Sequence, residues 1–343
     1  MTGYERIRAA IGGEWPDSVP VMLHNFMMAA REAGIRMAEF RRNPEALARA
    51  FIESAERYGV DGILVDVDTA TLAGAVGVPV DFPDDAPART IAGRLRRLEE
   101  AAELEPPRVG DYWGVQVWVE GVRILRKHFN NELFVRGNCD QAPYSLASAM
   151  RSPEAWMLDL MDPDRHEAVH RLLAYCLEAA CQFLELMARA GAHMVSNGDS
   201  PAGPELVSPR IYREFALPYE KRLVERAHRL GLPYFLHICG KTDRILADMI
   251  STGADGFELD HKTDARLAHE LLKDRAVFIG NLDPSAVLAL GTPALVEAET
   301  HRLIELFADT PRFILNAGCA IPPATPADNI RALIRAARGH RRG

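Results

Sequence analysis

Several features that would place this chain in a special class of protein are scarce or missing. Cysteine is scarce: five residues in 343 form an odd, sparse set, which excludes a disulfide scaffold and favours a reducing compartment. No run approaches the roughly 18 consecutive apolar residues that a membrane span needs. The first residues also lack the basic and apolar segments of a signal peptide. We therefore expect a cytoplasmic protein with no membrane segment.

Concentrated positive charge is missing as well. The chain has 48 Asp and Glu residues against 40 Lys and Arg residues, which gives a formal net charge of −8 at pH 7. Its most basic stretches, residues 94–97 and 335–342, are short. Nucleic-acid binding needs a concentrated basic stripe, so we expect no nucleic-acid partner.

What the chain does contain is a regular alternation of short β-branched-rich runs and segments with helical apolar spacing. Eight such runs separated by helices predict a single (β/α)₈ barrel domain over residues 1–343. The alternative is an open doubly wound sheet, but no Gly-x-Gly-x-x-Gly turn follows any of the runs. The expected strands are Val19–Phe26, Gly62–Asp68, Leu133–Asn138, His193–Asn197, Tyr234–Ile238, Gly256–Leu259, Val277–Gly280 and Phe313–Asn316.

The interval between the second and third expected strands is too long for one crossover helix. It contains a loop rich in Pro and Asp at residues 82–87, a charged helix and an alternating run at Tyr112–Ile124. Alternation of apolar and polar residues is the pattern of a strand. We interpret this run as a β-hairpin inserted near the mouth of the barrel.

One set of residues has the chemistry of a metal site. His237 and Cys239 lie two apart at the end of an expected strand, so both side chains can point to the same face. Cys319 closes the last expected strand, and in such barrels the carboxyl ends of the strands meet at the active site. One imidazole and two thiolates suit Zn²⁺ with one position left open. Asp260 is the natural fourth ligand or its neighbour, although it could instead cap the helix that follows; the two cysteines could also be small core residues.

Other polar residues also end expected strands. Asp66 and Asp68 close the second strand, two apart, and Asp199 ends the fourth. A carboxylate in this position is either a site residue or a cap for the loop. His24, near the end of the first strand, either lines the mouth or packs within it.

Along nearly its whole length the sequence resembles the uroporphyrinogen decarboxylase superfamily. Four segments carry the resemblance: Arg31–Arg41, Asp68 with Gly77 nine residues later, Gly198–Gly203, and Gly280–Pro284. Ser208-Pro209 through Pro218-Tyr219 fits as well. The resemblance implies a single (β/α)₈ barrel.

Three departures argue against porphyrinogen decarboxylation. The segment Ser145–Ala149 lacks the tyrosine of the decarboxylases, Cys319 stands where they have a histidine, and Ile35 replaces the second arginine of their carboxylate-binding motif. The gained residues are instead similar to the zinc-dependent methylcobamide:coenzyme M methyltransferase branch. These are His237-Ile238-Cys239-Gly240 and Gly318-Cys319, followed by Pro322-Pro323 and Asp328-Asn329.

This branch implies a zinc enzyme that moves a methyl group between a methylcobamide (a cobalamin-type corrinoid) and a thiol. Zn²⁺ would be held by His237, Cys239 and Cys319, with Asp260 as the acidic ligand. The corrinoid would belong to a separate partner protein, and the acceptor would be coenzyme M, a related small thiol or a folate. The pocket would be lined by Asp68, Asp199, Arg31 and His24, with Arg31 as the contact for a sulfonate or carboxylate.

Two other functions remain open. A metal-free decarboxylase or lyase would use Asp68 and Arg31 on a different acid. A binding or escort protein for corrinoids or porphyrins would keep the barrel without turnover. The first rival predicts activity that survives the loss of both cysteines.

Overall fold

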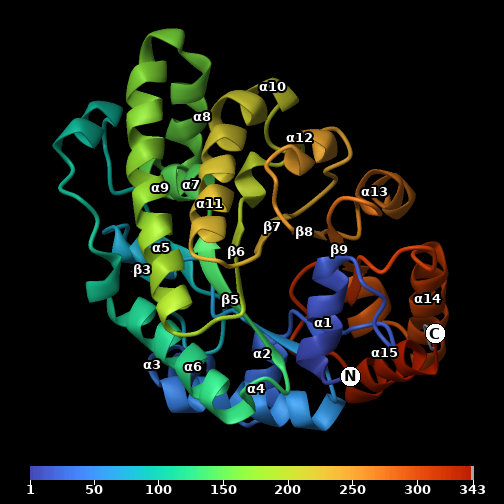
Figure 1. The fold of residues 1–343 in the computed structure, drawn as a ribbon. Coiled ribbons are helices and arrows are strands. Elements are labelled where there is room, and N and C mark those ends of the chain that lie inside the picture. Colours follow the sequence, from blue (N-terminus) through green and yellow to red (C-terminus); the bar gives the residue numbers. More distant parts are fainter. Residues whose placement is uncertain (341–343) are drawn as a thin grey trace.

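The protein is a closed barrel of eight parallel strands surrounded by helices, seen here in a computed structural model that describes residues 1–340 (Figure 1). The strands lie in the order β1-β2-β5-β6-β7-β8-β9-β10, and a parallel bridge between Val21 and Leu315 joins the first strand to the last. The (β/α)₈ expectation is confirmed, and each expected run overlaps one barrel strand, although four of the strands extend past the expected end. The barrel strands are β1 (Met22–Leu23), β2 (Gly62–Val65), β5 (Phe134–Gln141), β6 (Met194–Gly198), β7 (Tyr234–Ile238), β8 (Gly256–Leu259), β9 (Val277–Leu282) and β10 (Phe313–Ala317).

Helices follow each strand and form the outer layer. They begin and end where local chemistry predicts: α4 starts at Pro44 with Asn43 accepting from the Ala46 N–H, and ends at Gly59 in the left-handed conformation. The α-helices are α1 (Gly3–Gly12), α2 (Phe26–Glu32), α3 (Met37–Arg42), α4 (Pro44–Tyr58), α5 (Thr71–Ala75), α6 (Trp113–Phe129), α7 (Pro143–Arg151), α8 (Pro153–Met161), α9 (His166–Arg189), α10 (Pro209–Ile211), α11 (Leu217–Arg229), α12 (Leu246–Ile250), α13 (Ala265–Leu272), α14 (Pro293–Leu306) and α15 (Ala327–Gly339). Shorter 3₁₀ or π segments are η1 (Leu98–Glu103), η2 (Val109–Asp111), η3 (Pro163–Arg165), η4 (Ser200–Ala202), η5 (Tyr212–Ala216) and η6 (Pro284–Ala289).

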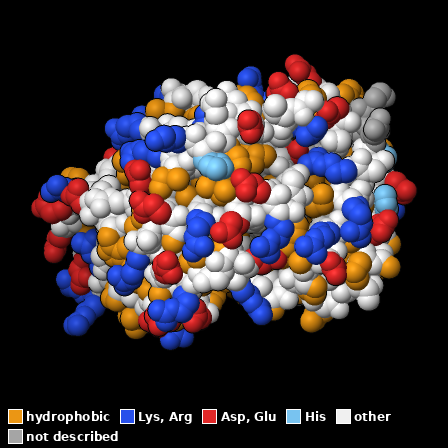
Figure 2. Space-filling view, turned by 90° about the horizontal axis from the view of Figure 1, so that it is seen from below, with side chains coloured by type: hydrophobic (Ala, Val, Ile, Leu, Met, Phe, Trp, Pro, Cys, Tyr) orange, Lys and Arg blue, Asp and Glu red, His pale blue; other side chains and the backbone are white. Residues whose placement is uncertain are grey.

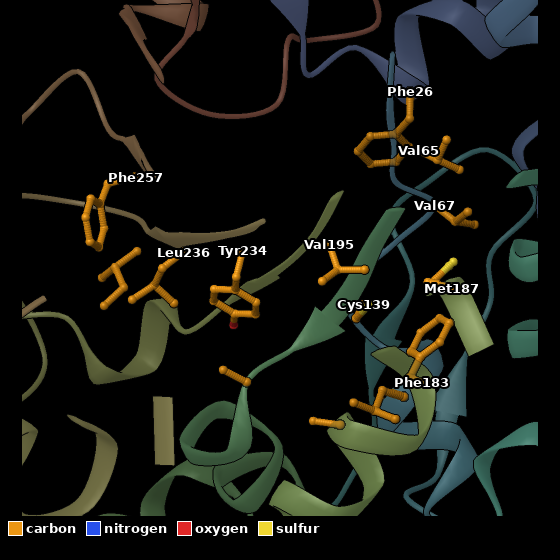
Figure 3. Close-up of a cluster of buried hydrophobic side chains, with 14 of the residues drawn as sticks. Phe26, Val65, Val67, Cys139, Phe183, Met187, Val195, Tyr234, Leu236 and Phe257 are labelled. Atoms are coloured by element: carbon orange, nitrogen blue, oxygen red, sulfur yellow. The ribbon is translucent and has the colours of Figure 1, made fainter. Parts of the chain in front are cut away.

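Apolar side chains fill the inside of the barrel toward the amino ends of the strands. One buried cluster takes residues from seven of the eight strands, including Met22, Leu64 and Phe235, and α1 adds Ile7 to it. A second, larger cluster lies between the strands and the helices. Figure 3 shows part of that outer layer, with side chains of α9 beside Cys139 of β5. Because the amino half is filled with hydrocarbon, polar chemistry is confined to the carboxyl ends of the strands.

The segment between β2 and β5 contains both a hairpin and a helix, but the hairpin is not where we expected it. The antiparallel pair is β3 (Val80–Asp81) with β4 (Arg89–Thr90). The expected hairpin at Tyr112–Ile124 is wrong, because Trp113–Phe129 forms α6. The alternating valines suggested a strand. The residues that become buried follow helical spacing: Val115, Trp118, Val119, Val122, Leu125 and Phe129.

The surface carries charges of both signs. Figure 2 shows one face, on which Lys and Arg side chains are interspersed with Asp and Glu side chains. No helix within residues 1–340 is both long and apolar enough to cross a membrane. The five cysteines, all within the described part of the chain, are free thiols.

Asp61 ties the first strand to the helices at the two ends of the chain. Its side chain is almost fully buried, and Oδ2 accepts a hydrogen bond from the Val21 N–H at 2.8 Å. Arg6 of α1 lies 3.0 Å from Oδ1, and Arg338 of α15 lies 2.9 Å from Oδ2. One carboxylate therefore holds α1, β1 and α15 together at the place where the barrel closes.

We expect Asp61→Asn to lower the free energy of unfolding by about 2 kcal/mol, because two guanidinium groups lose their shared buried charge. Urea unfolding followed by circular dichroism measures the change. The control is Asp328→Asn, whose exposed ion pair with Arg331 should contribute less than about 0.5 kcal/mol. Equal stability of the two variants would contradict the role given to Asp61.

Candidate metal centre

Three side chains from two distant parts of the chain converge at the carboxyl ends of β7 and β10. Nε2 of His237 lies 3.0 Å from Sγ of Cys239, and this sulfur lies 3.6 Å from Sγ of Cys319. One ligand atom from each of the three residues falls within 4.8 Å of the other two. The structure therefore brings together the His-Cys-Cys set that the sequence predicts.

The three groups share protons in a way that leaves a thiolate facing the imidazole. The hydrogen bond from Cys319 and the charge of His237 outweigh burial and lower the pKa of Cys239 to about 3. The same contact and burial raise the pKa of Cys319, so its thiol is the donor of the pair. Burial alone would lower the pKa of His237, but the Cys239 thiolate outweighs it and raises the pKa to about 10.

The orientation of His237 is set by the main chain of the neighbouring strand. Its Nδ1 donates to the carbonyl oxygen of Glu258 in β8 at 2.9 Å, which directs Nε2 toward the sulfurs. A histidine ligand in a metal site is held in this way, with one nitrogen fixed by a hydrogen bond and the other free for the ion. One imidazole nitrogen and two sulfurs form the donor set of a catalytic Zn²⁺ site, so these residues fit the ion.

Glycines next to both cysteines are required by the backbone. Gly240 has φ = 85°, a left-handed conformation that a residue with a Cβ adopts at a cost. A Cβ on Gly318 would lie 2.3 Å from the His261 nitrogen, where there is no space for it. The Cys239 N–H donates to Oγ of Ser200 at 3.1 Å, which holds this loop against the end of β6.

Asp260 supports the loops around the three ligand side chains. Its Oδ2 accepts from the Gly240 N–H at 2.8 Å, and its Oδ1 accepts from the Lys262 N–H at 3.0 Å. It does not belong to the group of three, and its place as fourth ligand stays a prediction. The alternative that it caps the following helix is wrong in detail, because Asp264 is the N-cap of α13.

A cavity of about 230 Å³ opens beside the three side chains. Apolar residues, including Phe26, Met27 and Leu64, form part of its wall. The polar part includes His24, which lines this cavity. The other polar lining residues are Asp66, Asp68, Thr69, Arg136, Asn138, Asp140, Gln141, Ser200 and Glu258, beside His237, Cys239 and Cys319.

A buried network of four charged groups lies in this wall. His24 contacts Asp66 through Nε2 at 2.7 Å and Glu258 through Nδ1 at 2.9 Å. Arg136 reaches the other oxygen of Glu258 at 2.5 Å. Burial would lower the pKa of His24, but the two carboxylates outweigh it and raise the pKa to about 9. Burial would raise the pKa of Glu258, but Arg136 and His24 outweigh it and lower the pKa.

The remaining expected site residues occupy different places. Asp68 lines the cavity, and its oxygens accept from the main chain of Ala70 and Thr71. Asp199 is fully buried behind the cavity, where it accepts from Ser145, and burial raises its pKa to about 6. Arg31 is exposed and lines a neighbouring hollow, which does not contain the three ligand side chains.

The sequence interpretation missed Glu258, Arg136 and Asp140. Glu258 is a charged residue in a strand that is otherwise apolar or small, while Arg136 and Asp140 are two charges in β5, which also contains Asn138 and Gln141; a charge within a strand was the available signal. A charge in a buried strand must have a partner. For Glu258 and Arg136 the partners are 122 residues apart in the sequence, so the pairing becomes visible only in the folded barrel.

Comparison with known proteins assigns the chain to a family. The sequence model of the uroporphyrinogen decarboxylase (URO-D) family matches residues 2–340. The chain belongs to this family. The methylcobamide:CoM methyltransferase MtbA of Methanosarcina mazei is 33% identical over 348 residues, covering 99% of this chain and all of the relative. The methylcobamide:CoM methyltransferase MtaA of Methanosarcina barkeri is 28% identical, with 96% of each chain covered.

A solved structure of a methyltransferase from Methanosarcina mazei has the same fold as this chain. It superposes with a TM-score of 0.90, at 24% identity and with 99% of each chain covered. This match confirms the fold, while the family model and the sequence relatives confirm the resemblance to the family and to its methylcobamide:CoM methyltransferase branch.

We expect Glu258→Gln to lower the free energy of unfolding by about 3 kcal/mol, since it leaves the buried guanidinium of Arg136 without a counter-charge. It should also lower the pKa of His24 from about 9, because one of its two carboxylate partners is lost. Urea unfolding and an NMR titration of the His24 ring measure the two effects.

The matched control is Glu120→Gln, which removes a half-exposed carboxylate paired with Arg123 on α6. It should change stability by less than about 0.5 kcal/mol. A wild-type His24 that loses its proton near pH 6.5 would show that the two carboxylates do not hold it charged.

Proposed function

We propose that the protein is a zinc-dependent methyltransferase. It moves a methyl group between a methylcobamide carried by a corrinoid partner protein and a small thiol such as coenzyme M or a related acceptor. The observation that carries the proposal is the convergence of His237, Cys239 and Cys319 within 4.8 Å beside a cavity. The names of the relatives support corrinoid-linked methyl transfer.

The three side chains would hold Zn²⁺ through Nε2 of His237 and the sulfurs of Cys239 and Cys319. When bound, zinc lowers the pKa of a coordinated thiol, so that the acceptor sulfur is a thiolate at neutral pH. Cys239 already lies in the thiolate state without help from an ion. The two protein thiolates would balance the charge of a divalent cation and leave the acceptor sulfur electron-rich.

The other residues would position the acceptor and keep water away. Apolar wall residues such as Phe26 and Met27 exclude solvent from part of the cavity. His24, held between Asp66 and Glu258, gives the wall a fixed positive charge close to the sulfurs. Asp260 would be the fourth ligand or, through its hydrogen bond to Gly240, would keep Cys239 in place. The free cysteines agree with a reducing cytoplasm as the place of action.

A metal-free decarboxylase or lyase is the second candidate, favoured by membership of the URO-D family. It would rely on Asp68, which lines the cavity, and on another acid as substrate. This candidate gives the cysteines no chemical role, so their removal separates the two functions.

We expect purified wild-type protein to contain about one zinc per chain and Cys239→Ala to contain far less, because two protein ligands remain. Metal analysis by mass spectrometry measures the content. Cys181→Ser is the control, since this thiol lies on α9, away from the cavity. Equal zinc content in wild type and Cys239→Ala would contradict the ligand assignment.

We also expect the zinc-loaded protein to consume a small thiol, coenzyme M or a related two-carbon thiol, in the presence of methylcobalamin. Chelation of the metal should abolish the reaction and added Zn²⁺ should restore it, because the free thiol is mostly protonated at neutral pH. Thiol consumption and the change in cobalamin absorbance follow the transfer. Activity that survives in Cys239→Ala and Cys319→Ala would favour the metal-free candidate.

A further inference from the structure

Every cationic side chain that lines the cavity already has a negative partner. Arg136 is the one Lys or Arg among the described lining residues, and it pairs with Glu258 at 2.5 Å. Both ring nitrogens of His24 contact carboxylates. His237 faces the Cys239 thiolate at 3.0 Å. The cavity therefore offers no free cation to a negatively charged group of a ligand.

Negative groups, in contrast, exceed the positive ones. Asp140 lines the cavity at a bulge where the pairing of β5 with β6 shifts, and its φ is 59°. Its Oδ2 accepts from the Leu72 N–H at 2.6 Å, but its Oδ1 is buried without any hydrogen-bond partner. No Lys, Arg or His forms an ion pair with it among the described residues. Asp68 is nearby in the same wall, and its one cationic neighbour is Arg41 at 3.9 Å.

Burial and the charge of Asp68 raise the pKa of Asp140 well above that of an ordinary carboxyl. Burial also raises the pKa of Asp68, against its hydrogen bonds from Ala70 and Thr71. Asp68 thus disfavours the ionisation of Asp140, which no cation among the described lining residues compensates. A buried carboxyl with an unused oxygen needs a donor or a positive charge to complete it.

We propose that the acceptor thiol carries an ammonium or other hydrogen-bond-donating group at the end remote from its sulfur, and that Asp140, with Asp68 beside it, selects such an acceptor over one with an anionic end. This inference rests on the proposed methyl transfer to a thiol in this cavity.

The charge balance of the cavity supports this choice. Two thiolates balance a divalent cation, and the acceptor sulfur adds one further negative charge as a thiolate. An ammonium group would compensate that charge and let Asp140 ionise. A sulfonate would instead add a second negative charge beside Asp68 and Asp140, which form no ion pair with any cation among the described lining residues. Like charges placed together in a desolvated site suppress binding strongly.

The arginine expected to bind an anionic acceptor does not lie in this wall. Arg31 is exposed in the neighbouring hollow, together with Arg36 and Asp85. The two hollows share Met27 as a lining residue, while the three ligand side chains belong to the other one. An anion held by Arg31 would therefore be outside the cavity that contains the sulfurs.

The test uses three thiols that share a two-carbon chain and differ in the end group: 2-aminoethanethiol, 2-mercaptoethanol and 2-mercaptoethanesulfonate. Zinc-loaded wild type is assayed with methylcobalamin as the methyl donor. We expect kcat/KM, expressed per thiolate, to be at least about tenfold higher for the amine than for the sulfonate, with the alcohol between them.

The informative variant is Asp140→Asn, because asparagine tolerates the positive φ and keeps an oxygen for the Leu72 N–H but cannot ionise. We expect the amine-to-sulfonate ratio to fall at least about fivefold in this variant. The pKa of each thiol and its tendency to chelate zinc are properties of the thiol itself. They affect assays of wild type and Asp140→Asn equally, so they cancel when the amine-to-sulfonate ratios of the two proteins are compared. The control is Asp274→Asn, an exposed residue in the loop before β9, which should keep the wild-type ratio.

The outcomes separate this inference from the proposed function. A wild-type preference for the sulfonate, or an unchanged ratio in Asp140→Asn, overturns the inference while thiol methylation itself still stands. If no thiol is methylated, the proposed function fails; calorimetric binding of the three methyl thioethers to the zinc-loaded protein then decides the inference. Amine-selective binding that weakens in Asp140→Asn supports it, and sulfonate-selective or unselective binding overturns it.

Discussion

Glu258 is the residue through which the two halves of the site depend on each other. Its carbonyl oxygen fixes Nδ1 of His237 and so directs Nε2 toward the sulfurs. Its carboxylate compensates both Arg136 and His24 in the cavity wall. Because these contacts come from one residue of β8, the orientation of the His237 imidazole and the charge balance of the cavity are coupled. A displacement of this strand would disturb both at once.

The barrel can hold this many buried charges because apolar and polar side chains occupy different ends of it. The apolar side chains lie toward the amino ends of the strands and the polar groups lie at the carboxyl ends. Toward the amino ends, residues such as Met22 and Phe235 fill the interior with hydrocarbon, and Ile7 of α1 adds to that packing. The carboxyl ends then carry loops whose main chain and side chains hold the polar groups. Most buried charged groups there have hydrogen-bonded partners; among the described residues, Oδ1 of Asp140 and Oδ2 of Asp199 are buried carboxylate oxygens without one, and of these two residues only Asp140 lines the cavity.

The shared His-Cys-Cys chemistry and the choice of acceptor depend on different parts of the cavity. In the proposed function, His237, Cys239 and Cys319 would bind the metal and, through it, the sulfur of the acceptor. Asp68 and Asp140 line the same cavity and, in the proposed selection, would face the end of the acceptor remote from its sulfur. Members of one family can therefore keep the metal chemistry while their cavity walls favour different acceptors, because a single wall carboxylate alters the charge balance without touching the ligands.

The sequence by itself determined the alternation of strands and helices, hence the barrel, and the three side chains that meet as the candidate metal centre. Strand ends and residue types are local properties, and in a parallel barrel they are sufficient to predict which ends meet. Local pattern failed at Trp113–Phe129, where alternating valines concealed a helix whose buried face only packing reveals. Tertiary structure alone decided that Glu258 pairs with Arg136 and His24, that Arg31 lies outside the cavity, and that Asp140 has no counter-charge. These pairings depend on the distances between side chains on strands that are remote in the sequence. Electrostatic energy varies with those distances and with burial, and no local sequence pattern encodes either.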